Sequence, residues 1–227
     1  MTGAAVPQLD VEIWSDVVCP WCYIGKRRFE QALRELEGEI DVHVTYRAYQ
    51  LDPTAPPGST MPVIEAYERK FGGRENAQQM IDRVTETAAT DGLKFKLDIA
   101  LRANTLLAHR LLWWADQPES PVSQDAMKER LLHAYFIDGL NIGDVDTLAR
   151  CAADVGFDLA TAIDFLESDT GAAEVAAQIA AATDLDITAV PTFVINRQWA
   201  VPGAQESDTF VNVLRRAAAR ITADAPG

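Results

Sequence analysis

Apolar and polar side chains alternate in two short segments near the start of the chain. Residues 9–15 (LDVEIWS) and 41–50 (DVHVTYRAYQ) both follow this pattern, which is typical of a β-strand with one buried face. Between the two segments, apolar residues recur at helical spacing from Cys22 to Leu36, and Gly38 can end such a helix. The start of the chain therefore predicts a strand, a helix and a second strand.

A Pro-rich segment at residues 53–58 (PTAPPG) interrupts this pattern and marks a boundary. Beyond it the apolar residues follow helical spacing, and Gly, Pro or Asp separates one helix from the next. We expect helices at residues 62–71, 75–90, 104–115, 121–138, 146–155, 158–168 and 172–183. Alternation returns at residues 192–196 (TFVIN) and 198–201 (QWAV), where a tight connection predicts a hairpin. A final amphipathic helix is expected at residues 206–221.

Strand patterns therefore stand on both sides of a long helical block. A chain of 227 residues is long enough for one large domain or two interleaved ones. We predict an α/β fold in which residues 9–52 and 170–222 build a four-stranded sheet. Residues 53–169 should form an all-helical insertion domain that acts as a lid and contributes no strand to this sheet.

The composition is that of a globular protein, with 48% hydrophobic and 24% charged residues. The net charge of −14 argues against nucleic acid as a partner, because phosphate binding needs a cationic surface. No run of 18 apolar residues occurs, so we expect no membrane span. The first residues reach Asp10 and Glu12 without a basic region, so we expect no secretory signal and a cytoplasmic protein.

Two of the three cysteines stand three positions apart, in Cys19-Pro20-Trp21-Cys22. The pair follows the first predicted strand and opens the first predicted helix, whose first position suits Pro20. It could be a structural disulfide, half of a metal site, an inert reduced pair or a dithiol that cycles between redox states. In a reducing cytoplasm a close pair is more often catalytic or metal-binding than structural.

A zinc site would need two further ligands. The remaining soft ligands are Cys151, His43, His109 and His133, and they include no second pair at ligand spacing. We therefore expect no bound metal. The start of a helix favours redox chemistry instead, because unpaired N–H groups and the helix dipole stabilise a thiolate there.

The helical pattern predicts different roles for the two cysteines. Cys22 lies on the apolar stripe shared with Phe29 and Leu33, whereas Cys19 precedes Pro20 at the helix tip. We therefore predict that Cys19 is the more accessible and the more acidic thiol. The two-residue spacer lets Cys22 reach back to a mixed disulfide on Cys19 and resolve it.

Several stretches resemble one known family. SDVVCPWCYIG at residues 15–25 and AVPTFVIN at residues 189–196 resemble the DsbA-like branch of the thioredoxin superfamily, and in particular its FrnE-type proteins. Three further stretches are similar to the same branch, at residues 102–115, 134–144 and 190–205. The likeness covers nearly the whole chain. It implies a thioredoxin fold interrupted by a large helical insertion, and a thiol–disulfide oxidoreductase activity.

The resemblance also implies roles for individual residues. Cys19 would be the nucleophile, and Cys22 would be the resolving thiol. Pro191 would be a cis-proline that faces the pair, with the Val190 backbone held against an incoming substrate strand. Without the resemblance, an ordinary trans proline that opens a strand is the favoured interpretation of Pro191.

Other positions are candidates for substrate contacts. Pro20 and Trp21 lie between the cysteines and stiffen the turn. Asn104 and His109 fall in the NTLLAHR stretch and would line the cleft, where His109 could aid proton transfer. A helix-surface histidine without a catalytic part is an equal alternative. Cys151 lies within a predicted helix, and we interpret it as a buried, unreactive thiol.

Two other functions remain open for this sequence. Glutathione-dependent enzymes of the 2-hydroxychromene-2-carboxylate isomerase and kappa-class transferase type share the implied fold, but they typically carry serine where Cys19 stands. The second alternative is a non-catalytic protein that binds metal or a client peptide in its cleft.

The leading hypothesis is a thiol–disulfide oxidoreductase. It would need no cofactor beyond its own disulfide, or else a low-molecular-weight thiol such as glutathione. Its partner would be a thiol or disulfide substrate, either a protein or a small molecule. Nucleic acid and membranes are not expected partners, and a homodimer is the oligomeric state that we keep open.

Overall fold

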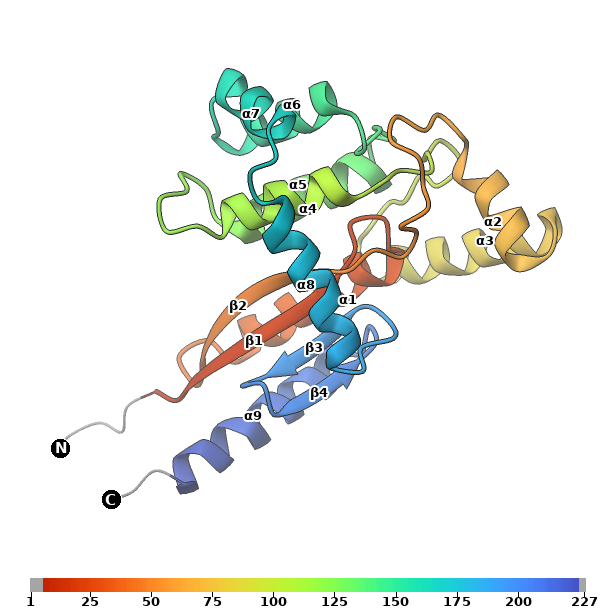
Figure 1. The fold of residues 1–227 in the computed structure, drawn as a ribbon. Helices are drawn as coiled ribbons and strands as arrows, with labels where there is room; N and C mark the ends of the chain where they lie inside the picture. The colour runs from red at the N-terminus through yellow and green to blue at the C-terminus, as the bar shows by residue number, and fades with distance from the viewer. Residues whose placement is uncertain (1–5, 225–227) are drawn as a thin grey trace.

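The four predicted strands form one mixed sheet in the computed structural model, which describes residues 6–224 (Figure 1). The strands are β1 (Gln8–Ser15), β2 (Asp41–Ala48), β3 (Thr192–Ile195) and β4 (Trp199–Pro202). Their order across the sheet is β2-β1-β3-β4, with β1 parallel to β2 and the other two pairs antiparallel. Strands from the two ends of the chain therefore pair with each other, as the sequence predicts.

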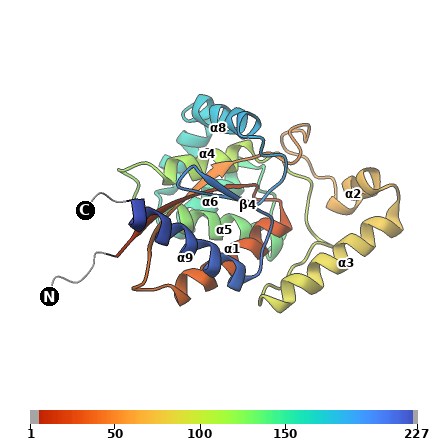
Figure 2. The ribbon, with the colours of Figure 1, turned by 90° about the horizontal axis from the view of Figure 1, so that it is seen from below.

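Three helices cover the two faces of this sheet. They are α1 (Pro20–Glu35), α8 (Ala172–Asp184) and α9 (Ser207–Asp224). The alternation along β1 sends Val11 into the core beneath α1 and α9, whereas Trp14 packs with Ala182 of α8 on the opposite face. Figure 2 shows the sheet between α8 on one side and α1 with α9 on the other.

Three aromatic rings pack together where α1 and α9 lie against the sheet. The ring centroid of Phe29 on α1 lies 5.0 Å from that of Phe193 on β3 and 5.1 Å from that of Phe210 on α9. Phe193 and Phe210 are 4.5 Å apart. Such close, tilted contacts stabilise a core beyond the area that they bury, and they hold the helix that carries the cysteine pair in a fixed place.

The middle of the chain is helical. Its helices are α2 (Val63–Phe71), α3 (Arg74–Thr90), α4 (Leu106–Ala115), α5 (Gln124–Phe136), α6 (Val145–Val155) and α7 (Leu159–Glu167). Residues 53–169 contribute none of the four strands of the sheet. The predicted α/β fold, a sheet interrupted by a helical insertion, is therefore confirmed.

One apolar core crosses from the sheet part into the helical block. Tyr23 and Ile24 of α1 belong to the core that the insertion helices build. The Tyr23 ring lies 5.8 Å from the ring of Phe95 and 6.0 Å from that of Phe136. The division into domains at residues 52/53 and 169/170 stays a prediction.

Two helices of the block begin two or three residues later than the sequence predicts, and in each a side chain bonds to the first turn. Asn104 Oδ1 accepts a hydrogen bond from the Leu106 N–H at 3.0 Å, so α4 starts at Leu106. Ser123 Oγ accepts from the Ala126 N–H at 3.2 Å, so α5 starts at Gln124. The first N–H groups of a helix have no partner within it, so these side-chain bonds satisfy them where each helix begins.

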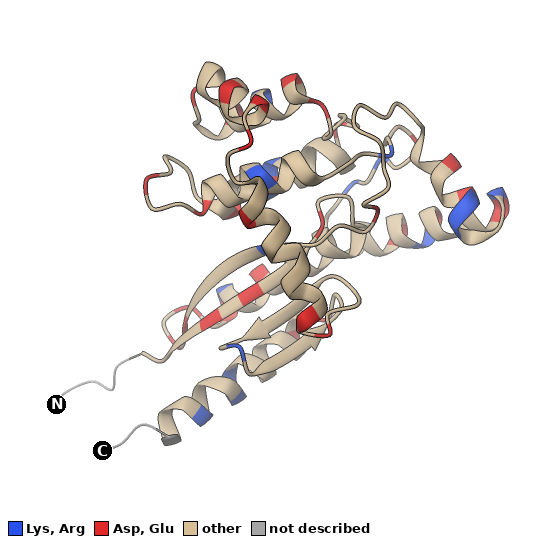
Figure 3. Cartoon of the chain, viewed as in Figure 1, with Lys and Arg blue, Asp and Glu red and all other residues tan. Residues whose placement is uncertain are grey.

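Charged side chains are distributed unevenly over the surface. Acidic residues are spread over both halves of the molecule, whereas Lys and Arg colour parts of α9 and of α2 in Figure 3. Within residues 6–224, none of the helices combines the length and the apolar character that crossing a membrane requires.

Candidate active site

The cysteine pair stands where the chain leaves β1 and enters α1. Cys19 precedes the helix with an extended backbone (φ −87°, ψ 113°), and Pro20 is the first helical residue. The Cys19 N–H donates to the Asp16 carbonyl at 3.3 Å, and the Cys22 N–H donates to the Cys19 carbonyl at 3.0 Å. These local bonds hold two free thiols at the N-terminus of α1.

The predicted exposure of Cys19 is wrong, because both cysteines are only 3% exposed. The residues around Cys19 account for this burial. Val17 belongs to the apolar core of the helical block, and Val18 and Trp21 pack against that core. The helical insertion therefore helps to bury the tip of α1.

The Val190–Pro191 segment lies directly across from Cys19. Its peptide bond is cis, and the Val190 carbonyl oxygen accepts a hydrogen bond from Cys19 Sγ at 3.6 Å. Helix α1 approaches this segment at Gly25, where a Cβ atom would stand 3.0 Å from Pro191 Cγ. The Gly203 N–H donates to the Pro191 carbonyl at 2.7 Å. The structure thus brings Cys19, Val190 and Pro191 together.

Burial and the contact between the two sulfurs act on the pKa of both thiols. The hydrogen bond to Cys22, together with burial and the charge of Cys22, raises the pKa of Cys19 well above its usual value. Burial opposes ionisation of Cys22 as well, but the Cys19 thiol, the Lys128 ammonium and the Ser15 hydroxyl outweigh it and lower the Cys22 pKa. Because the two sulfurs interact this strongly, their titration is a property of the pair, and the assignment of the more acidic thiol to Cys19 stays a prediction.

Lys128 is a member of this site that the sequence analysis missed. It lies on α5, is 1% exposed, and its Nζ has no hydrogen-bond partner among residues 6–224. A signal for it exists in the sequence, since Lys128 stands three and four positions before Leu131 and Leu132, on the buried stripe of the helix. A charged residue on an apolar stripe is unusual enough to single out.

His109 contacts a buried carboxylate. Its Nε2 lies 3.2 Å from Asp16 Oδ1 and 3.0 Å from the Tyr49 carbonyl oxygen. The other oxygen of Asp16 accepts from the Leu51 N–H at 2.8 Å, and Asp16 is fully buried. The alternative of a helix-surface histidine is wrong, since His109 is 2% exposed. His109 orients Asp16, and its part in proton transfer stays a prediction.

Asn104 makes its hydrogen bonds within the protein. Besides bonding to the first turn of α4, its Nδ2 donates to the Ala55 carbonyl at 2.8 Å. These bonds tie the loop that follows β2 to the helical block. Asn104 and His109 are not among the residues that line the pocket beside the cysteine pair.

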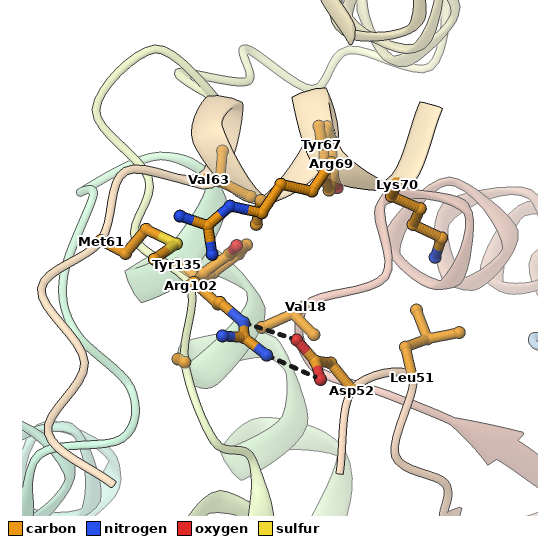
Figure 4. A pocket seen from close by; sticks show the side chains of 12 residues that line it. Val18, Leu51, Asp52, Met61, Val63, Tyr67, Arg69, Lys70, Arg102 and Tyr135 are labelled. Atoms are coloured by element: carbon orange, nitrogen blue, oxygen red, sulfur yellow. Dashed lines mark hydrogen bonds and ion pairs between the residues drawn. The ribbon is translucent and has the colours of Figure 1, made fainter. Parts of the chain in front are cut away.

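That pocket has a volume of about 410 Å³, and it is lined by Val18 but by neither Cys19 nor Cys22 (Figure 4). Arg102 and Asp52 both line this pocket and form an ion pair, with 2.7 Å between Arg102 Nε and Asp52 Oδ2. The guanidinium of Arg69 projects into the same space from α2, and Lys70 stands at its edge. Because one carboxylate faces three cations, the pocket carries a positive surplus on a chain whose net charge is −14.

A metal site and the third cysteine were the remaining candidates for chemistry in the sequence. Among residues 6–224, no cluster of three or more His, Cys, Asp or Glu side chains could hold a metal ion. Cys151 is fully buried within α6, and burial raises its pKa. This burial agrees with the predicted buried thiol, and its lack of reactivity stays a prediction.

Comparison with known proteins identifies relatives of this chain. The model of the family described as DSBA-like thioredoxin domain matches residues 10–215. The crystal structure of a probable DsbA oxidoreductase from Streptomyces coelicolor is 33% identical to this chain with a TM-score of 0.85. The match covers 92% of this chain and 89% of that one.

Two more distant structures share the fold. A 2-hydroxychromene-2-carboxylate isomerase matches with a TM-score of 0.67 at 13% identity, over 96% of this chain and 100% of that one. The cytosolic disulfide reductase DsbM from Pseudomonas aeruginosa, solved with GSH, matches with a TM-score of 0.57 at 18% identity. That match covers 92% of this chain and 98% of the other. At such low identity the likeness shows the fold alone.

Proposed function

This chain belongs to the DSBA-like thioredoxin domain family, and on that basis we propose that it exchanges thiols and disulfides through Cys19 and Cys22. The observation that carries the proposal is the pair itself. Two free thiols meet at the N-terminus of α1, and Cys19 Sγ lies 3.6 Å from the Val190 carbonyl oxygen. Exchange needs an attacking thiolate and a second thiol within reach, and the pair supplies both.

Reduction of a substrate disulfide proceeds in two steps in this proposal. The proton of Cys19 passes to Cys22, and the Cys19 thiolate attacks one substrate sulfur, so that a mixed disulfide forms and the other substrate sulfur leaves. Cys22 gives its proton to that leaving thiolate and attacks Cys19, which releases the second substrate sulfur. Two electrons pass to the substrate, and a Cys19–Cys22 disulfide remains. The reverse steps oxidise a substrate dithiol.

The substrate backbone would lie along the Val190–Pro191 segment. The carbonyl of Val190 faces Cys19, so a chain that bonds to this backbone would present its sulfur to the attacking thiol. Pro20 and Trp21 stand next to the sulfurs in the first turn of α1 and remain proposed contacts of the same substrate.

The charge of the pocket beside Val18 supports a small anionic cosubstrate. Arg69, Lys70 and Arg102 face a space of about 410 Å³, and Asp52 neutralises only one of them. A low-molecular-weight thiol such as glutathione carries carboxylates that suit these cations. We therefore assign such a thiol, in its reduced or disulfide form, as a cosubstrate of the pair.

Replacing Arg69 with glutamate should slow the reaction with oxidised glutathione about tenfold, because the change reverses one charge in the pocket. The reaction with an uncharged small disulfide should change less than about twofold. Steady-state rates with the two disulfides measure the difference. Arg74→Glu is the matched control, since Arg74 is exposed, pairs with Glu68 and does not line the pocket. Equal losses with both disulfides would show that the pocket does not bind the anionic cosubstrate.

A direct assay tests the activity itself. Wild-type protein should reduce the disulfides of insulin when a small thiol regenerates it, and it should reach a defined redox equilibrium with glutathione. A variant with both Cys19→Ser and Cys22→Ser should show neither property. If the double variant matches the wild type, the proposed function is wrong.

The isomerase-type alternative has one observation in its favour, which is the shared fold of the 2-hydroxychromene-2-carboxylate isomerase. Such an activity would borrow its thiol from glutathione and would not need Cys19. A Cys19→Ser protein that isomerises its substrate with added glutathione would support this alternative. Loss of all activity in that variant would support disulfide exchange.

We also propose that the protein works in the cytoplasm, where dithiols are kept reduced. The cytosolic disulfide reductase DsbM, which shares the fold of this chain, supports this proposal. Fractionation of the source cells, with the protein followed by antibody, tests this assignment.

A further inference from the structure

We infer that Tyr67 and Tyr135 form a binding site for the small thiol that reacts with Cys19, and that their hydroxyls donate hydrogen bonds to one of its carboxylates. The two tyrosines line the pocket beside Val18 from different helices, Tyr67 from α2 and Tyr135 from α5 (Figure 4). This inference rests on the proposed function and deepens it, because it names the residues that select the cosubstrate.

The first argument compares the hydroxyls of the five tyrosines in the chain. Three of them donate to an oxygen of the protein itself, and these belong to Tyr23 (to Glu129, 2.7 Å), Tyr46 (to Asp125, 2.8 Å) and Tyr49 (to the Thr188 carbonyl, 3.3 Å). Within residues 6–224, the hydroxyls of Tyr67 and Tyr135 have no such partner. The two tyrosines without a partner are also the two that line the pocket.

The burial of Tyr135 makes its missing partner significant. The residue is 1% exposed and belongs to the apolar core of the helical block. Buried hydroxyls are hydrogen-bonded in the large majority of cases, because an unpaired one costs free energy. The Tyr135 oxygen is not among the enclosed polar atoms that lack a partner, so it opens onto the pocket that the residue lines. The molecule that occupies the pocket therefore supplies its acceptor.

Tyr67 brings a second hydroxyl to the same pocket. Its ring packs edge-on against that of Phe71, with 5.5 Å between the centroids, and it also packs against the core of the helical block. Burial raises the pKa of Tyr67, and the charges of Cys19 and Asp16 raise it further. Burial likewise raises the pKa of Tyr135 well above its usual value. Both phenols therefore keep their protons at neutral pH and act as donors.

The other polar side chains of the pocket are also donors, with one exception. Arg69, Lys70 and Arg102 supply cations, and the exception is Asp52, which already pairs with Arg102. A carboxylate has two acceptor oxygens and accepts from neutral hydroxyls and from cations at the same time. Val18 lines the same space with its apolar side chain, and apolar surroundings strengthen such hydrogen bonds. The pocket therefore fits a carboxylate.

Val18 connects this pocket to the thiol pair. It lines the pocket and directly precedes Cys19 in the chain. A small thiol whose carboxylate bonds to Tyr67 and Tyr135 would extend from the pocket toward Cys19. A substrate without a carboxylate makes neither bond. The two hydroxyls therefore act on the choice of the cosubstrate and not on the transfer of electrons between the sulfurs.

The test is the binding of reduced glutathione to a protein with both Cys19→Ser and Cys22→Ser, which cannot exchange disulfides, followed by NMR titration. Adding Tyr135→Phe should raise the Kd about tenfold, because the complex loses one hydrogen bond to a charged group. Tyr67→Phe should raise the Kd about threefold, since a half-buried hydroxyl is more accessible to water. Tyr67→Phe also serves as the second variant if Tyr135→Phe does not fold.

The specificity is measured in the protein with both cysteines. Tyr135→Phe should raise the KM for oxidised glutathione about tenfold and change kcat less than about twofold, because the lost bond acts on binding. The KM for an uncharged small disulfide should change less than about twofold, because that substrate has no carboxylate to lose a bond. An equal rise in KM for both disulfides would contradict the carboxylate assignment.

Tyr46→Phe is the matched control, because the Tyr46 hydroxyl donates to Asp125 within the protein and does not line the pocket. This variant should unfold at a lower urea concentration and bind glutathione as before. Tyr135→Phe should show the opposite behaviour, with an unchanged unfolding midpoint and weaker binding, since its hydroxyl has no bond to lose within the fold. Equal losses of binding in the two variants would overturn the inference.

Unchanged binding in a folded variant of either tyrosine would overturn the inference, and so would the absence of glutathione binding when both tyrosines are present. The binding measurement requires no turnover of a substrate. A protein that binds glutathione through the two tyrosines but fails to reduce insulin would contradict the proposed function alone. A protein that reduces insulin but binds glutathione equally well without the two hydroxyls would contradict the role of Tyr67 and Tyr135 alone.

Discussion

Replacing Cys19 with serine should lower the rate of disulfide exchange by about a thousandfold or more, because a serine hydroxyl does not attack a disulfide sulfur. The choice of Cys19 as the attacking residue follows from its position. Its Sγ faces the Val190 carbonyl oxygen at 3.6 Å, whereas Cys22 is one of the buried residues of α1. The initial rate of insulin reduction measures the loss.

Replacing Cys22 with serine should stop the same reaction one step later. The mixed disulfide on Cys19 can form but cannot be resolved, so it should accumulate and be visible as added mass on the intact protein. Cys151→Ser is the matched control for both variants, because Cys151 is fully buried in α6 and takes no part in the exchange. A Cys22→Ser protein that turns over normally would contradict the division of roles.

Replacing Arg110 with methionine should reduce the free energy of unfolding by about 3 kcal/mol. Arg110 is 4% exposed, and its guanidinium donates to four backbone carbonyl oxygens at the end of α7 and just beyond it. The acceptors are Phe165 at 2.8 Å, Leu166 at 3.2 Å, Ser168 at 2.6 Å and Thr170 at 2.9 Å. Removing the guanidinium takes one donor from each of these oxygens, although the Phe165 oxygen still accepts from the Ser168 N–H and hydroxyl.

These bonds lie where the chain leaves the helical insertion and returns to the sheet. Urea unfolding of the variant measures the change, and Arg150→Met is the control, since Arg150 on the neighbouring α6 is exposed. Arg110→Lys should recover only part of the loss, because an ammonium cannot reach four carbonyls in the plane of a guanidinium. A loss below about 1 kcal/mol in the methionine variant would show that solvent or rearrangement satisfies the carbonyls.

The sequence by itself determined the strands, the helices and the place of the thiol pair. Alternation along residues 9–15 gives β1 its two faces, and the helical spacing from Cys22 to Phe29 gives α1 its buried stripe. Pro20 can only start a helix, so Cys19 had to stand at its N-terminus. These features depend on neighbours within a few positions along the chain, which is why a single sequence predicts them.

Only the tertiary structure determines how deeply the two sulfurs are buried and which charged groups lie near them. Val18 and Trp21 pack against a core built by the insertion helices, and this contact buries a cysteine that local rules place at an exposed tip. Lys128 lies on α5, more than a hundred positions from the cysteines along the chain, and its buried ammonium favours the charged form of Cys22. Burial and electrostatic interaction depend on distance in space and on exclusion of water, and neither quantity can be read from spacing along the chain.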